Sequence, residues 1–222
     1  MVTPRAAVHA ALREMATALR AQLAEATIPL PATEDYDVVR ADLVNRLGDA
    51  FLGYVSTTRG AADKNEARRA VVEDVPAAFY RGYKDAGAEE VETDDAAWVT
   101  AQVRSQLAWL DKTFADLLAQ RKAESATESD LRNRAEVWGV TLDGIYAEGK
   151  LRGGQNVMLT FDGDDGEESC RECQKYKGKR HSAKWWIKRD LVRRNGNEHY
   201  TCGRWRNCHH HFYLDDGTLY AE

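Results

Sequence analysis

The feature that most constrains the fold is the confinement of all four cysteines to the last quarter of the chain. Cys170 and Cys173 form a Cys-x-x-Cys pair, and Cys202 and Cys208 form a second, wider pair. A zinc ion takes about four soft or borderline ligands in a tetrahedron, and a Cys-x-x-Cys turn can supply two of them. The spacing therefore predicts one structural zinc ion in this segment.

The wide spacing of the second pair leaves the fourth zinc ligand open. The residues between Cys202 and Cys208 form a broader loop than the usual zinc knuckle. Any of His209, His210 or His211 could replace Cys208 as a ligand. Four protein ligands leave no open position for water, which favours a structural zinc site over a catalytic one.

Disulfide bonds and redox chemistry are the alternatives for the same cysteines. Their even number permits disulfides, but the first 27 residues lack the continuous apolar stretch of a secretory signal. We therefore expect synthesis in a reducing cytoplasm, where clustered cysteines more often bind metal. No strand–helix–strand pattern surrounds the Cys-x-x-Cys pair, which disfavours a redox motif. No apolar run approaches the ~18 residues of a membrane helix, so no membrane partner is expected.

Charge divides the chain into two parts. Residues 170–212 carry twelve Lys/Arg and three Asp/Glu, a net charge of +9, whereas the other residues carry 19 basic and 33 acidic groups, a net charge of −14. This break predicts a helical body at 1–150 and a zinc-binding domain at 151–222. The basic side chains could contact nucleic-acid phosphates or an acidic protein surface, or could be solvated. The nucleic-acid-binding candidates are Lys179, Arg180, Lys184, Lys188, Arg189, Arg193 and Arg194.

The helical body is predicted from apolar residues that recur every three or four positions. Pro29 and Pro31 should end the first helix, and Pro76 should kink or split the third. Thr93–Asp95 provides a cap and an acidic first turn for the fourth helix, and the fifth helix follows Thr127–Asp130. The apolar stripes span 8–23, 39–54, 71–83, 99–117 and 131–145.

The pattern changes near Val157, where a short apolar run up to Phe161 predicts a strand closed by a turn at 162–166. Residues 212–214 could form a second strand that pairs near the first. The predicted fold class is mainly α: a helical body with a small C-terminal zinc-binding α+β segment that contains short strands.

A nuclease of the His-Asn-His type is the enzymatic alternative, since Glu198–His199 resembles the start of such a motif. That site needs a further strand and a metal-binding helix after the motif. Here Cys202 follows His199 within three residues, and only eleven residues remain after His211. The sequence therefore favours a protein that is not an enzyme.

Several stretches in order resemble a known family. They are Ala78–Gly87, Asp143–Gly149, Lys177–Lys179 after the Cys-x-x-Cys pair, and Cys202–Trp205. From about Phe79 to Leu214 the chain resembles the minor head, or head-morphogenesis, proteins of tailed phages and prophages, typified by the Mu F-like proteins. The run of three histidines departs from the family pattern at its last ligand.

The resemblance implies a minor structural component of the virion head. Such proteins associate with the portal and other capsid proteins, and help head assembly or DNA delivery. On this interpretation the chain is made in the host cytoplasm and carried in the virion. The alternative function is that of a zinc-stabilised nucleic-acid-binding protein, with DNA as its partner.

Overall fold

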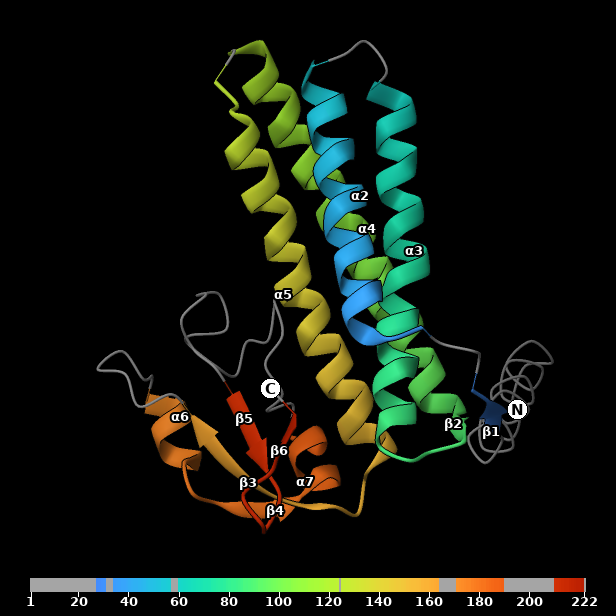
Figure 1. Ribbon diagram of the computed structural model, residues 1–222, viewed down its shortest axis with the longest axis vertical. Coiled ribbons are helices and arrows are strands. Elements are labelled where there is room, and N and C mark those ends of the chain that lie inside the picture. The colour runs from blue at the N-terminus through green and yellow to red at the C-terminus, as the bar shows by residue number, and fades with distance from the viewer. Residues whose placement is uncertain are drawn as a thin grey trace, which may run out of the picture.

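The computed structural model describes residues 27–30, 34–56, 60–123, 125–163, 171–189 and 210–221. Four long helices stand side by side as a bundle, and a small sheet with two short helices lies at one end of it (Figure 1). The bundle helices are α2 (Tyr36–Ser56), α3 (Gly60–Asp85), α4 (Thr93–Lys122) and α5 (Glu128–Gly153). The described part of the chain is thus mainly helical with a small antiparallel sheet, as the sequence predicts at this coarse level.

The apolar stripes identify the buried faces of the bundle helices. Val39, Leu43, Leu47 and Phe51 of α2 are all at most 5% exposed, which confirms their predicted role in the core. The predicted start of the last helix is also confirmed. The Thr127 hydroxyl accepts a hydrogen bond from the Asp130 amide at 3.2 Å, and the Asp130 carboxylate accepts one from the Thr127 amide, so the two form a capping box.

Two details of the predicted helices are wrong. Pro76 does not split its helix, because α3 runs without interruption from Gly60 to Asp85. Burial of Val75 and Phe79 against the neighbouring helices offsets the backbone hydrogen bond that proline cannot donate. The cap of α4 is Glu92 rather than Thr93, and it makes no side-chain capping bond.

α3 is the central helix of the bundle, since it packs against α2, α4 and α5. The main core fills the space between these helices with buried apolar side chains, the largest of which are Trp138, Phe51, Phe79 and Phe114. None of the helices in the described ranges is long and apolar enough to cross a membrane.

A short two-stranded ribbon lies beside the sheet end of the bundle. β1 (Thr27–Pro29) pairs antiparallel with β2 (Glu90–Glu92), and Ile28 is the register partner of Val91. The helix predicted over 8–23 lies outside the residues that the structure describes. The ribbon was not predicted, because each of its strands has only three residues.

The small sheet is antiparallel throughout, with strand order β4-β3-β5-β6. Its strands are β3 (Met158–Gly163), β4 (Arg180–Ser182), β5 (His210–Tyr213) and β6 (Leu219–Ala221), and its helices are α6 (Arg171–Tyr176) and α7 (Ala183–Lys188). The two predicted strands and their pairing are confirmed as β3 and β5. Asp162 and Gly163, expected in a turn, instead extend β3, because His211 and His210 of β5 pair with them.

A second core lies between the sheet, α7 and the end of α5. Its buried side chains include Leu159, Phe161, Trp186 and Phe212, and Ala147 and Leu151 of α5 join them. α5 therefore packs into both cores. The expected domain boundary after residue 150 falls in the last turn of this helix, and the division into two domains stays a prediction.

Candidate metal centre and basic patch

The predicted zinc ligands lie mostly outside the described residues. Cys170, Cys202, Cys208 and His209 belong to undescribed stretches, and Cys173 is a position of α6. Within the described ranges, no group of three or more His, Cys, Asp or Glu residues is placed to hold a metal ion. The four-cysteine site therefore stays a prediction.

The two described candidate histidines lie on opposite faces of β5, since neighbouring side chains of a strand alternate. His210 is 1% exposed, and its ring meets the ring of Phe161 edge to face at 5.4 Å. His211 is half-buried, and its Nδ1 lies 3.4 Å from the Tyr213 hydroxyl. A site on one face of this strand can thus take one of these two histidines, not both.

The strand register places the end of β3 and the start of β5 at the same end of the sheet. Gly163, the last residue of β3, is the register partner of His210, the first residue of β5 (Figure 1). Cys170 follows Gly163 by seven positions, and Cys208 precedes His210 by two. The helix α6, which contains Cys173, packs against β3. The segments that carry the two pairs therefore leave the sheet at the same end.

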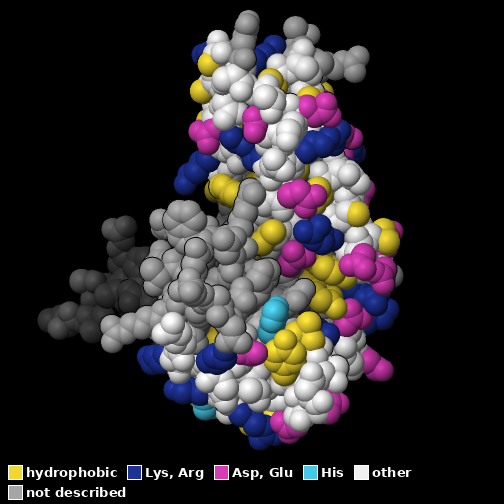
Figure 2. Space-filling view, turned by 60° about the vertical axis from the view of Figure 1, so that its left-hand side comes forward, with side chains coloured by type: hydrophobic (Ala, Val, Ile, Leu, Met, Phe, Trp, Pro, Cys, Tyr) yellow, Lys and Arg dark blue, Asp and Glu magenta, His cyan; other side chains and the backbone are white. Residues whose placement is uncertain are grey.

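Five of the seven predicted nucleic-acid-binding residues are described, and all five are exposed; Arg193 and Arg194 lie outside the described residues. Lys and Arg side chains gather at the lower end of the molecule in Figure 2. The described and exposed cations of α6, β4, α7 and the residues next to them are Lys175, Lys177, Lys179, Arg180, Lys184, Lys188 and Arg189.

Ring contacts join several of these cations into one surface. The ammonium groups of Lys175 and Lys179 lie 5.2 and 5.4 Å from the ring centroid of Tyr176. The Tyr176 and Trp185 rings are 6.2 Å apart, and the Arg189 guanidinium lies over Trp185 at 3.8 Å. We call this surface the basic patch; it comprises Lys175, Tyr176, Lys179, His181, Trp185 and Arg189.

His181 is also part of the patch, with its ring stacked on Trp185 at 3.7 Å. Burial lowers the pKa of His181, and the positive charges of Arg189 and Lys179 lower it further. This shift favours the neutral imidazole beside the Arg189 guanidinium.

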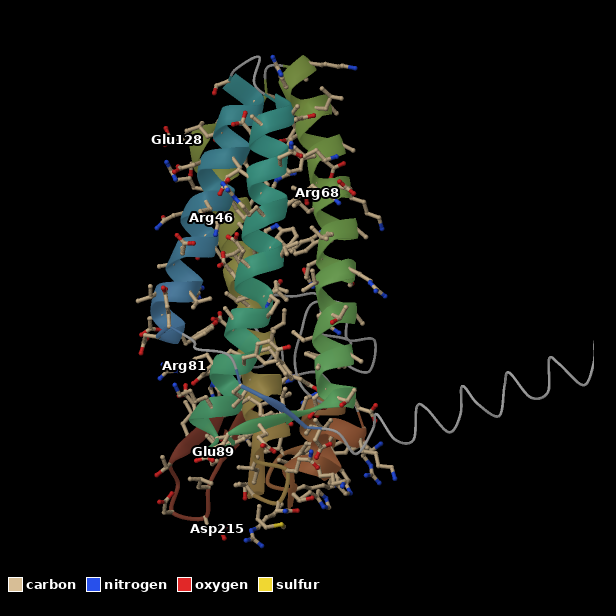
Figure 3. All side chains as sticks on the ribbon, turned by 90° about the vertical axis from the view of Figure 1, so that its right-hand side faces the viewer. Arg46, Arg68, Arg81, Glu89, Glu128 and Asp215 are labelled. Carbon is tan, nitrogen blue, oxygen red and sulfur yellow. The ribbon has the colours of Figure 1, made fainter. Side chains whose placement is uncertain are left out.

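Two cations near the patch are held by carboxylates. Arg180 makes two hydrogen bonds to Asp215, at 2.7 and 2.5 Å, and Asp215 lies at the lower end of the molecule (Figure 3). This contact lowers the pKa of the Asp215 carboxyl. Lys177 lies 3.8 Å from Asp162. Arg180, a predicted nucleic-acid contact, is thus paired with a carboxylate in the turn between β5 and β6.

A buried polar cluster was not predicted. The Arg152 guanidinium contacts the Asp95 carboxylate at 2.5 Å and the Glu148 carboxylate at 2.7 Å, and Tyr83 donates to Asp95 at 2.5 Å. Burial and the Asp95 contact raise the pKa of Tyr83. The cluster ties α3, α4 and α5 together beside an open pocket of about 680 Å³, which Glu90 and Glu92 also line.

This cluster is better explained as a clamp than as a catalytic site. The Arg152 guanidinium contacts both carboxylates, and it also lies over the ring of Trp98 at 4.6 Å. From the sequence, Glu148 and Arg152 form an ordinary i, i+4 pair of a kind that usually lies on a solvated helix face. No signal in the sequence distinguishes the buried pair from an exposed one.

Comparison of the chain with protein-family models, curated protein sequences and solved structures found no significant match in any of the three.

Proposed function

We propose that the chain is a non-enzymatic structural protein of a phage head, a minor component of a tailed phage or prophage that associates with the portal and other capsid proteins. Its C-terminal segment is held by one structural zinc ion. The protein is made in the host cytoplasm and carried in the virion. The family resemblance motivates the role, and three structural relationships support it.

The observation that carries the proposal is the packing of the stretches that resemble the family. Residues 78–87 comprise the end of α3 and the turn that follows it, and residues 143–149 lie near the end of α5. These stretches are far apart in the sequence but meet where the helices cross, and the Tyr146 hydroxyl donates to the Asp85 carboxylate at 2.8 Å. Two of the four stretches that carry the resemblance therefore pack against each other, and this contact supports the proposal.

The second support is the connection from this crossing to the sheet. α5 places Ala147 and Leu151 in the core of the sheet and then leads through a short turn to β3. A long bundle joined to a small sheet through a shared helix suits a protein that spaces or connects partners in an assembly.

The third support concerns the zinc ion. Among the residues that the structure describes, the second core has eight buried members, and two of them come from α5. Such a small core usually needs a metal, a disulfide or a partner to hold it. Because Gly163 and His210 are paired, the cysteine pairs start from the same end of the sheet. A zinc ion there would bind the two ends of the segment and supply folding free energy.

The nuclease alternative rests on Glu198 and His199, which lie outside the described residues. This alternative can be tested separately, because a His-Asn-His site uses its histidine as the base and needs a divalent metal. Cleavage of plasmid DNA that requires added magnesium and disappears in His199→Ala would replace the head role with an enzymatic one.

The direct test is the composition of particles. The gene should be tagged in cells that produce the phage whose genome encodes it, and heads should be purified. We expect the tagged chain in the heads at low copy number, together with portal protein in pull-downs from disrupted particles. The His199→Ala variant is the matched control and should enter heads normally. Heads of normal composition that lack the chain would contradict the proposal.

A further inference from the structure

The basic patch and its neighbours contain positive charges that the fold does not use. Among the residues that the structure describes, Lys175, Lys179, Lys184, Lys188 and Arg189 have no carboxylate within ion-pair distance, and all five are exposed. Like charges close together repel, and the 15 residues from Lys175 to Arg189 contain no Asp or Glu, so this concentration of cations costs free energy. A partner that supplies negative charge would remove this cost.

The aromatic rings of the patch are covered by the protein itself. His181 stacks on Trp185 at 3.7 Å with an interplanar angle of 7°, and the Arg189 guanidinium lies over the same ring at 3.8 Å. Two groups cannot occupy the same space above one ring, so His181 and Arg189 lie on opposite faces of Trp185. Neither face of the indole is then open to a stacking base.

These contacts favour a nucleic-acid backbone over a protein partner. Protein interfaces have an apolar core with few charged residues, whereas interfaces with nucleic acids are polar and strongly positive. The patch presents cations, and its rings are beneath them. Nucleic-acid proteins that bind single strands stack bases on open aromatic rings, and the covered Trp185 does not offer such a platform.

We propose that the basic patch, with Lys184 and Lys188, binds the phosphate backbone of duplex nucleic acid without reading its sequence. Arg189 and the lysines supply the phosphate contacts, and Trp185 holds Arg189 in place from below. Arg180 is not part of this surface, because Asp215 holds it. The inference does not depend on the head role, since a protein outside any virion could use the same surface.

Fluorescence anisotropy of the full-length protein with labelled DNA duplexes tests this proposal. The affinity should fall steeply with salt, with a slope of log K against log salt of about −0.9 for each phosphate contacted. If all five cations bind, the slope approaches about −4.5. Duplexes of unrelated sequence should bind with affinities that agree within about twofold, because phosphates are common to all of them.

A triple variant, Lys179→Gln with Lys188→Gln and Arg189→Gln, should weaken binding and reduce the magnitude of the slope by roughly 2.7. The matched control removes Arg104 and Lys112, which are exposed cations of α4 without a carboxylate partner among the described residues. Their replacement by glutamine should leave the slope unchanged. Circular dichroism should show that both variants remain folded, since every replaced side chain is exposed.

Three results would overturn the proposal. The first is no duplex binding even at low salt. The second is equal loss of binding in the patch variant and the α4 variant, which would mean that net charge alone attracts DNA. The third is binding to polyglutamate as tight as binding to duplex, which would make an acidic protein the partner.

Discussion

Gly82 of α3 and Gly149 of α5 meet at a crossing where neither position has room for a side chain. A Cβ atom on Gly82 would lie 2.2 Å from the Tyr146 carbonyl oxygen, and one on Gly149 would lie 2.2 Å from the Phe79 carbonyl oxygen. These neighbours are backbone atoms of packed helices, so they cannot turn aside. The two glycines therefore set how closely the helices approach and where the end of α5 meets the sheet.

Replacing either glycine with alanine should destabilise the protein. Gly82→Ala and Gly149→Ala should each cost at least the ~1–3 kcal/mol typical of overpacked cores, because the backbones must move apart. Thermal unfolding measures the loss. Gly48→Ala is the control, because its nearest neighbour is the mobile end of Arg132 at 3.2 Å. There the helix propensity of alanine should make the change neutral or stabilising. A Gly82→Ala protein that melts at or above the wild-type temperature would contradict this packing.

The carboxyl of Asp74 should make stability depend on pH. Asp74 is buried between α2 and α3 near Arg46, which also bonds to Asp42, Glu66 and Glu73 (Figure 3). Burial raises the pKa of Asp74 to about 7, although Arg46 opposes the shift. Because the folded pKa lies above the unfolded one, the stability contributed by this group is present below about pH 4 and is lost as the pH rises to 7.

Asp74→Asn mimics the protonated carboxyl and should therefore stabilise the protein at pH 8 by at least about 1 kcal/mol. At pH 4 the variant and the wild type should have similar stability. Urea unfolding at the two pH values provides the comparison. Asp42→Asn, which alters an exposed partner of the same arginine, should show no such pH dependence. A uniform loss of stability at both pH values would mean that the contact with Arg46 outweighs burial.

Arg152 should be the most sensitive charged residue of the bundle. Arg152→Met would leave the carboxylates of Asp95 and Glu148 buried without their cation, at a cost of about 3–5 kcal/mol. Arg132 of the same helix also contacts two carboxylates, but its partners are largely exposed. Arg132→Met should thus cost less than about 1 kcal/mol. Equal losses in chemical denaturation would show that the cluster is not a buried clamp.

The parts of the fold that could be predicted are those set by local patterns. The stripe from Val39 to Phe51 depends on neighbours three or four positions apart and appears as expected, whereas the capping box of Thr127 and Asp130 was not predicted. The strands β3 and β5 follow from short apolar runs. β4 and α7 were missed, because elements of three and six residues depend on packing that a sequence does not display.

Long-range relationships account for the rest. Gly82 and Gly149 look like weak points of their helices, and only the crossing explains them. The same holds for the sandwich of Trp185, since a tryptophan among basic residues suggests an open stacking platform before the contacts of His181 and Arg189 are known. For the metal site, the sequence supplies the candidate ligands. The described strands show only that β3 ends and β5 begins at the same end of the sheet.

Loss of one cysteine should loosen the sheet more than the bundle. If the proposed zinc ion holds the segment after α5, Cys202→Ser should make that segment sensitive to protease, because its small core would lose the metal. The bundle helices should keep their main unfolding transition, since their core is much larger. His199→Ala is the control and should leave protection intact. Melting of bundle and sheet in one lowered transition would show that the two cores fold as a single unit through α5.

The metal content of the protein tests the central claim most directly, because a structural zinc ion holds the C-terminal segment in this account. The chain should be purified without chelator and measured by elemental analysis and by titration of free thiols under native conditions. We expect about one zinc per chain with the four cysteines protected, as a closed tetrahedral site requires. Less than about a tenth of an equivalent of zinc, with all four thiols free to react, would contradict the account.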